Sequence, residues 1–352
     1  MIYDVAIAGG GPAGLAAAIR AAQRGFKAVV LERSDGPLDK ACGEGLMPAG
    51  AHELSLLGAH LETAQPFFGI RYLQDEQVVE ARFKKGNGLG IRRTVLSSAL
   101  RERASELGAE VRRATVQSAH AGPQSIAIAT DQGEVLARLL IAADGLHSPL
   151  RHAAGLDAPG PPAPPRFGIR RHYQLAPWSD LVEVHWSAGV EAYLTPVGPA
   201  CVNVAFLSGR GAGFDELLSR FPALQRKLAG AEAGSETRGA GPLLQRVRAR
   251  RADRLALLGD AAGYVDAITG QGLSLAFAGA AILIEALPQD LSQDLAPALA
   301  GYDRALRSRW LRYAIPARVL VALSRRPSLR RSAIRSVAAF PGAFGALVKV
   351  VG

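Results

Sequence analysis

Three glycines near the start of the chain have a spacing that suits the binding of a pyrophosphate. Gly9, Gly11 and Gly14 form the pattern G-x-G-x-x-G, and Pro12 and Ala13 lie between the last two. The first glycine permits a tight turn, the second lets the backbone approach a pyrophosphate, and the third lets a helix pack closely on a strand. The open N–H groups and positive end of that helix then face the phosphates. The predicted chemistry is the binding of a dinucleotide.

The elements expected around these glycines agree with that interpretation. An apolar strand precedes the turn, an Ala-rich helix is expected over 15–24, and a second apolar strand over 28–31. Glu32 ends this strand about twenty residues beyond the turn, where a carboxylate can accept a hydrogen bond from a ribose hydroxyl, and Arg33 follows it as a further candidate cofactor contact. A second glycine run over 209–213 has a different spacing and is predicted to be a loop.

Two later segments also combine an apolar strand with a turn. One strand runs into Asp144 and Gly145, and another runs into Gly259 and Asp260, followed by Thr-Gly-Gln-Gly over 269–272 and an apolar helix. Together with the N-terminal unit, these ordered motifs resemble those of the flavoprotein family that includes para-hydroxybenzoate hydroxylase, the geranylgeranyl reductases and the flavin-dependent halogenases. The resemblance implies that the dinucleotide is FAD.

In that family the Gly-Asp pair, here Gly259 and Asp260, binds the ribityl chain of FAD, since a carboxylate accepts hydrogen bonds from hydroxyls. Gly270, Gln271 and Gly272 would place backbone N–H groups and a helix N-terminus against the N1/C2=O edge of the flavin. That edge becomes anionic on reduction, so the helix dipole favours the reduced flavin.

The resemblance also implies roles for Asp144, Gly145 and one arginine. The family's Asp-Gly segment is associated with both FAD and NAD(P)H, and NAD(P)H is the expected electron donor. An arginine that opens the helix predicted over 93–107 helps to hold the FAD pyrophosphate. Arg93 matches that position, with the neighbouring Arg92 as the alternative.

The loop over 38–48 is expected to run beside the flavin ring. Its Cys-Gly-Glu-Gly-Leu sequence is similar to the Cys-Gly-Gly of the geranylgeranyl reductases, but Glu44 replaces one glycine. The Cys42 thiol could donate a proton or tune the flavin, and Lys40 could meet a phosphate or the anionic flavin. The alternative for Cys42 is a small buried packing residue.

The predicted fold is α/β, with a Rossmann-like FAD-binding domain interleaved with a mixed β-sheet substrate domain of the α+β type and a helical, basic C-terminal tail. The predicted boundaries are 1–65, 91–160 and 245–300 for the FAD domain, 66–90 and 161–244 for the substrate domain, and 301–352 for the tail. A β-meander is expected over 110–116, 125–130 and 135–141, and one helix over 214–228.

The strand-rich segment 166–207 holds the candidate substrate pocket. Tyr193-Leu-Thr-Pro196 and the later Asn203-Val are similar to a family segment whose proline lies near the flavin on the substrate side. Tyr193 or His172 could orient or deprotonate a phenol. Each could instead be a buried sheet residue with its hydrogen bonds satisfied. The expected substrate is an apolar or aromatic small molecule.

The positive charge of the chain belongs to its tail. Residues 304–352 hold ten Arg, one Lys and no acid, a net +11, whereas the whole chain has +10, so residues 1–303 carry a net −1. The arginines alternate with apolar residues in a helical pattern predicted to break at Pro316, Pro327 and Pro341. Such a segment can lie on an anionic membrane surface. The alternative is a helical hairpin on the FAD domain. Nucleic acid is not expected, since no base-reading module accompanies the charge.

Composition adds broad expectations. The chain has 352 residues, of which 49% are hydrophobic and 20% charged, as in ordinary globular enzymes. Two cysteines are too few for a disulfide framework or a metal site. The first motif begins near residue 3, and no apolar run reaches about eighteen residues. The expected location is the cytoplasm, with the inner face of the membrane as a peripheral site.

Three reactions of the family can be compared with these residues. Halogenases carry a W-x-W-x-I-P segment, which Trp178, Trp186 and Trp310 do not form. An NAD(P)H-dependent monooxygenase, which hydroxylates a phenolic or polyketide-like lipid through a flavin hydroperoxide, is favoured because Glu44 departs from the reductase loop. A reductase of isoprenoid double bonds is the alternative, supported by the Cys42 loop and by a glycine where most aromatic hydroxylases have His after Gly-Asp-Ala-Ala. Besides these reactions, a flavin-binding protein without catalysis is possible.

Overall fold

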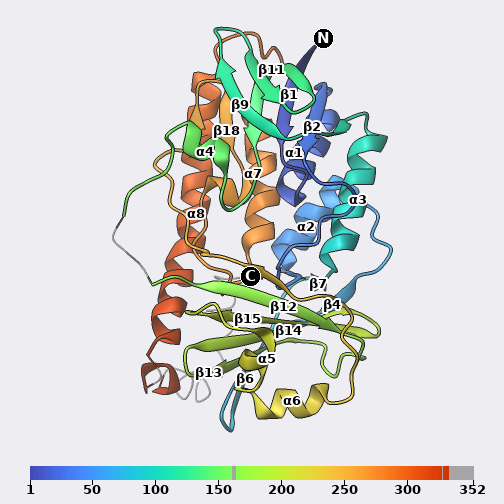
Figure 1. The fold of residues 1–352 in the computed structure, drawn as a ribbon, viewed down its shortest axis with the longest axis vertical. Helices are drawn as coiled ribbons and strands as arrows, with labels where there is room; N and C mark the ends of the chain where they lie inside the picture. The colour runs from blue at the N-terminus through green and yellow to red at the C-terminus, as the bar shows by residue number, and fades with distance from the viewer. Residues whose placement is uncertain (161–163, 327, 333–352) are drawn as a thin grey trace.

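The computed structural model describes residues 1–160, 164–326 and 328–332, and it has two lobes with one long helix along the side of both (Figure 1). The first lobe is built on an eight-stranded sheet with the order β17-β18-β11-β1-β2-β8, to which β10 and β9 add through β11. Its strands are β1 (Ile2–Ala8), β2 (Ala28–Glu32), β8 (Glu110–Arg113), β9 (Val116–Ala121), β10 (Ile126–Thr130), β11 (Gly133–Ala142), β17 (Arg251–Ala252) and β18 (Leu255–Leu257).

The centre of this sheet is parallel and buried. β1 pairs in parallel with β2 on one side and with β11 on the other, so Ile7 lies opposite both Val30 and Ile141. β18 continues the parallel set beyond β11, and β8 continues it beyond β2. The carboxyl ends of β1, β2, β11 and β18 therefore meet at one edge, where the strand order reverses and open α/β sheets bind their ligands.

Helices cover the parallel strands. They are α1 (Pro12–Gln23), α2 (Pro48–Leu57), α3 (Arg93–Glu106), the short α4 (Pro149–Ala153) and α7 (Gly272–Ala286), with a 3₁₀ turn η1 (Gly259–Ala262) before α7. α7 is apolar on nearly all sides and packs against α1, α2 and the last helix. An apolar surface all around the helix requires this burial on several sides.

The second lobe is a seven-stranded sheet with the order β16-β12-β15-β14-β13-β5-β6. Its strands are β5 (Gly69–Gln74), β6 (Gln77–Arg82), β12 (Phe167–Tyr173), β13 (Val182–Ser187), β14 (Val190–Gly198), β15 (Cys201–Ser208) and β16 (Arg238–Ala240). A three-stranded sheet of β3 (Gly45–Leu46), β7 (Gly88–Gly90) and β4 (Gln65–Phe67) lies at the junction of the lobes.

The two faces of the seven-stranded sheet have different neighbours. The outer face packs on α5 (Phe214–Leu218) and α6 (Pro222–Leu228), with Phe206 against Phe214 at a centroid distance of 4.9 Å. The inner face turns toward the first lobe (Figure 1). Because side chains alternate along a strand, Glu191, Tyr193 and Thr195 of β14 all point to this inner face.

The last described helix, α8 (Ala296–Ser324), runs down both lobes (Figure 1). The predicted break at Pro316 is wrong, since the helix passes through it. Proline removes one backbone hydrogen bond, but Tyr313, Ala314 and Ala317 are buried around it, and this packing holds the helix together. The predicted breaks at Pro327 and Pro341, and the tail over 333–352, lie outside the described residues.

Two other predictions about elements are corrected. The single helix expected over 214–228 is two short helices, because Pro222 starts a new one and has no N–H to continue the first. The segment 110–116 does not join a meander as one strand. Its first half, β8, pairs in parallel with β2, and the antiparallel meander consists of β9, β10 and β11.

Candidate functional site

The glycine turn at the end of β1 requires glycine at two positions for steric reasons. Gly9 has φ +104°, and a Cβ there would lie 2.4 Å from the carbonyl oxygen of Ala143. A Cβ on Gly14 would lie 2.0 Å from the carbonyl oxygen of Gly9. Gly11 caps α1 with Pro12 as its first residue, and no side chain caps the helix or places an acid in its first turn. The N–H groups of α1 are therefore open to an anion.

Glu32 closes the turn from the end of β2. One carboxylate oxygen accepts from the N–H of Gly10 at 2.7 Å, and the other accepts from the N–H of Ser34 at 2.9 Å. A carboxylate has about four acceptor positions, so room remains for a ribose hydroxyl. The next residue, Arg33, is exposed.

Asp144 and Gly145 lie beside the glycine turn, at the end of β11. Asp144 accepts from the N–H of Leu150 at 3.2 Å, in the first turn of α4. Burial raises the pKa of Asp144, and its hydrogen bonds to Ser148 and Leu150 oppose the shift. Gly145 has φ +92°, which favours glycine. This segment supports the turn and shares the same sheet edge.

Gly259 and Asp260 reach the same place from β18. A Cβ on Gly259 would lie 2.7 Å from Cβ of Ala13, so η1 approaches the start of α1 closely. The Asp260 carboxylate is accessible yet surrounded by protein on most sides. Burial raises its pKa, and the charges of Arg93 and Lys40 oppose this shift.

Arg93 turns toward the glycine turn. Its Nη2 lies 4.0 Å from the ideal Cβ position of Gly11, and its buried Nε has no hydrogen-bond partner among the described residues. Arg92 instead lies by Cys201. Lys40 completes the positive group, and burial lowers its pKa. An unpartnered guanidinium N–H at a helix N-terminus is suited to a pyrophosphate.

The turn before α7 lies near η1, since Gly272 lines the same pocket as Gly259 and Asp260. Gly270 has φ +65°, and Gln271 precedes Gly272, the first residue of α7. No side chain caps α7, and its first turn contains no acid. Tyr193 donates a hydrogen bond to the carbonyl of Ile268 at 3.3 Å, which ties this turn to β14. The residues at the sheet edge thus fit FAD, since two open helix N-termini, one unpartnered arginine donor and one carboxylate lie close together there.

The loop before β3 is fastened to the substrate sheet at four points. Asn203 donates to the carbonyl of Cys42 at 2.9 Å, and Thr195 donates to the carbonyl of Gly43 at 2.7 Å. The other two points are ionisable pairs, which are His172 with Glu44 and Arg170 with Asp39. Backbone and side chains of this loop are therefore held in one position between the lobes.

Glu44 is the residue that sequence reasoning missed. Its Oε2 lies 2.5 Å from Nε2 of His172, and its Oε1 accepts from the N–H of Arg93 at 2.7 Å, at the start of α3. Ser235 lies 2.8 Å from the other ring nitrogen of His172. Glu44 has φ +56°, unusual for a residue with a side chain. The only indication of its role in the sequence was that Glu44 stands where the family has glycine.

Cys42 is partly exposed and lies near Arg93 and Asp260, whereas His172 has both ring nitrogens engaged by protein. Burial raises the pKa of Cys42, and the charges of Arg93 and Glu44 act on it in opposite directions. Its sulfur accepts from the N–H of Glu44 at 3.3 Å. The thiol therefore stays protonated at neutral pH. The catalytic roles of Cys42, Tyr193 and His172 remain predictions.

Aromatic side chains fill the space between the inner face of the sheet, the turn before α7 and α8. Burial raises the pKa of Tyr72 to about 12 and raises that of Tyr193 well above its usual range. Burial also raises the pKa values of Tyr264 and Tyr313. Neutral phenols and apolar side chains thus face this space.

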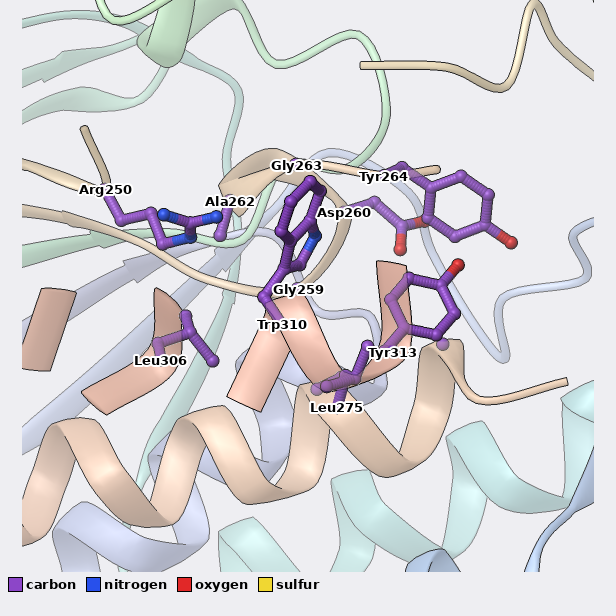
Figure 2. Close-up of a pocket in the computed structure, with 12 residues that line it drawn as sticks. Arg250, Gly259, Asp260, Ala262, Gly263, Tyr264, Leu275, Leu306, Trp310 and Tyr313 are labelled. Atoms are coloured by element: carbon purple, nitrogen blue, oxygen red, sulfur yellow. The ribbon is translucent and has the colours of Figure 1, made fainter. Parts of the chain in front are cut away.

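A cleft opens beside these residues, with an empty volume of about 390 Å³, part of it open to solvent. Figure 2 shows Asp260, Tyr264 and Tyr313 close together at one end and Arg250 at the other, with Trp310 between them. The Arg250 guanidinium carbon lies 5.4 Å from the Trp310 ring centroid. The cleft connects the cofactor edge with the inner side of α8.

A buried charged triad supports the turn before α7. Arg166 contacts Asp266 at 3.0 Å and Glu191 at 2.7 Å. Asp266 also accepts from the N–H of Ile268 at 3.0 Å, so the triad positions the residue to which Tyr193 donates. Sequence reasoning missed this triad, because its members come from three distant segments.

Comparisons with known proteins point to the same cofactor. The model of the FAD binding domain family matches residues 2–187. The dialkyldecalin synthase of Streptomyces rugosporus is 31% identical over 304 residues, which are 78% of this chain and 62% of that protein. Digeranylgeranylglycerophospholipid reductase 2 of Methanopyrus kandleri is 27% identical over 338 residues, 88% of this chain and 82% of that protein.

A solved structure has the same fold. The flavin-dependent brominase Bmp2 has a TM-score of 0.80 and 18% identity, and the match covers 95% of this chain and 93% of that one. The family match, the glycine turn and the residues at the sheet edge agree. The chain belongs to the family of FAD-dependent oxidoreductases that includes para-hydroxybenzoate hydroxylase and the geranylgeranyl reductases.

Proposed function

We propose that this protein uses FAD to reduce carbon–carbon double bonds of an isoprenoid-like lipid. The observation that carries the proposal is Cys42, whose thiol is protonated and whose backbone carbonyl accepts a hydrogen bond from Asn203 of the substrate sheet. The proposal reverses the order of the two reactions considered from the sequence, since hydroxylation was favoured there.

Reduction of a double bond adds one hydride and one proton to the two carbons. FAD, reduced by a donor such as NAD(P)H, supplies the hydride when bound. The chain must supply the proton from a group that is protonated at neutral pH and close to the flavin edge. Cys42 meets the first condition, and the resemblance of its loop to the family's flavin-side loop supports the second. Cys42 is partly exposed, so the thiolate left behind can recover its proton from solvent.

Hydroxylation of a phenol would make a different demand on the pocket. It is assisted by a base that removes the phenol proton. His172 is held between Glu44 and Ser235, and the raised pKa of Tyr193 makes it a poor base at neutral pH. These features support the reductase over the monooxygenase.

The surroundings of Tyr193 support an apolar substrate. Val184, Trp186, Ile268 and Tyr313 belong to one buried apolar cluster, and Tyr193 packs against it. A polar substrate would lose its hydration there without compensation. The similarity to a digeranylgeranylglycerophospholipid reductase over most of both chains points to the same class.

The monooxygenase remains the second candidate because Glu44 departs from the reductase loop.

A single-turnover experiment without oxygen separates the two reactions. The photoreduced holoenzyme is mixed with a polyprenyl lipid, and the flavin spectrum and the product mass are followed. A reductase reoxidises its flavin anaerobically and yields a product heavier by two hydrogens. Reoxidation that requires oxygen and a product that gains an oxygen atom would overturn the proposal.

Cys42 is tested in the same assay. We expect Cys42→Ala to slow anaerobic reoxidation by about 10²-fold or more, since loss of a general acid has effects of this order, and to leave FAD content unchanged. Cys201→Ser is the matched control, because Cys201 lies at the start of β15 and should not alter the rate. Equal rates for Cys42→Ala and the control would remove Cys42 from the mechanism.

A further inference from the structure

We infer that the exposed face of α8 docks the protein on an anionic lipid surface. The first observation is a row of apolar side chains in water. Leu311, Ile315 and Val319 are 40%, 59% and 54% exposed. Residues four apart lie on one face of a helix. The row therefore forms a continuous apolar strip along the outside of α8.

Arginines surround this strip. Arg304 lies eleven residues before Ile315, about three helical turns away on the same face. Arg326 lies two residues beyond Ser324, the last residue of α8. Arg312 and Arg318 flank the strip on its two sides. All four are exposed. The strip is thus apolar at its centre and cationic at its ends and edges.

These arginines lack acidic partners. No Asp or Glu follows Asp303 in the sequence. In the described residues from 304 onward, the only ion pair is that of Arg331 with Asp75 at 3.5 Å. The four arginines around the strip are therefore available to external anions, and their charge is not neutralised by the fold.

A lipid surface is the partner that satisfies both parts of this face. The apolar strip can enter the boundary of the acyl chains, while guanidinium groups bind lipid phosphates above it. A second copy of the chain would bring two cationic faces together. A soluble polyanion would neutralise the arginines but would leave Leu311, Ile315 and Val319 in water.

The opposite side of α8 faces the candidate substrate space. Tyr313, Ala314 and Ala317 are buried in the apolar cluster that Tyr193 contacts. One helix therefore separates the proposed membrane face from the aromatic cleft. If the proposed function holds, this arrangement gives a lipid substrate a short path from the bilayer to the site; the docking itself does not depend on the reaction.

Vesicle co-sedimentation of the full-length holoenzyme tests the docking. Vesicles of phosphatidylcholine alone are compared with vesicles that contain phosphatidylglycerol, and neither contains a substrate. We expect tight binding only with the anionic lipid. Replacement of Leu311, Ile315 and Val319 by Ser, or of Arg304, Arg312 and Arg326 by Gln, should each weaken it at least tenfold. The substituted side chains are exposed, so the fold should persist, and FAD content verifies this.

The matched control replaces Val78 and Leu136, which are 51% and 38% exposed on other elements, by Ser. It should bind the vesicles like the natural chain. Unchanged binding of the Leu311, Ile315 and Val319 variant would overturn the proposal in favour of a soluble polyanion or an acidic protein. Equal binding to vesicles with and without phosphatidylglycerol would also overturn the proposal. Because the vesicles hold no substrate, failure of the proposed reaction would not change this result.

Discussion

The cofactor end and the substrate end of this protein are built in different ways. At the cofactor end, the critical atoms belong to the backbone: the turn at Gly9 and Gly14, and the open N–H groups of α1 and α7. At the substrate end, the contacts are made by side chains on the inner face of one sheet, such as Tyr193 and Glu191.

This difference decides how each end tolerates substitution. A backbone turn with positive φ and close contacts admits one residue type, so a single methyl group can abolish it. A sheet face admits many side chains if volume and hydrogen bonding are preserved. The family can therefore keep its cofactor site while its substrates vary. The three predictions below test this contrast.

The largest effect on FAD binding is expected from Gly14→Ala. The new Cβ would lie 2.0 Å from the Gly9 carbonyl oxygen, so the strand and α1 must separate. Overpacking of this kind costs about 1–3 kcal/mol, which corresponds to about a fivefold to 150-fold loss of FAD affinity if the strain falls on the bound turn. Flavin content after purification and a titration of the apoprotein with FAD measure it. The control is Gly211→Ala, since a Cβ on Gly211 meets nothing within 4 Å. Equal FAD affinities of the two variants would contradict the contrast between the two ends.

Glu44→Ala tests the junction between the two ends. It removes the acceptor of the Arg93 N–H and the partner of Nε2 of His172, and we expect the free energy of unfolding to fall by about 2–4 kcal/mol. Denaturant titration measures this loss. Glu44→Gln should lose less, because its amide oxygen still accepts from Arg93. A double-mutant cycle with His172→Ala gives the coupling directly, and strict additivity would show that the two side chains do not act together.

The smallest effect on FAD binding is expected at Glu183, on the outer face of the substrate sheet. Burial raises the pKa of Glu183, but hydrogen bonds from His185 and Trp178 outweigh it and lower the pKa from 4.5 to about 2. A depressed carboxyl pKa stabilises the fold above the unfolded-state pKa, and this contribution is lost as the pH falls through the folded-state value.

Glu183→Gln should therefore lower the free energy of unfolding by up to about 3 kcal/mol at neutral pH. The difference from the natural chain should shrink as the pH falls from about 4.5 toward about 2. Denaturant titrations at several pH values measure it. FAD affinity should not change, because Glu183 lies away from the cofactor edge. A difference that does not vary with pH, or a loss of FAD, would contradict the prediction.

The sequence by itself determined the cofactor end. Gly9, Gly14, Gly259 and Gly270 are needed for local backbone reasons, so their spacing from neighbouring strands and helices could be interpreted without the fold. The same holds for the charge of α8, since a helical period relates nearby residues. Prediction was less successful where a neighbouring segment decided the outcome, as at Pro316, which tertiary packing keeps within a helix.

Only the tertiary structure decided the contacts between the two ends. Glu44 and His172 are 128 residues apart, and Arg166 and Asp266 are 100 apart. Nothing in the local sequence of Glu44 indicates a histidine partner, because the contact depends on how β12 and the loop before β3 are placed by separate sheets. Backbone requirements are local and leave a pattern in the sequence, whereas side-chain partnerships depend on distances that only the folded chain establishes.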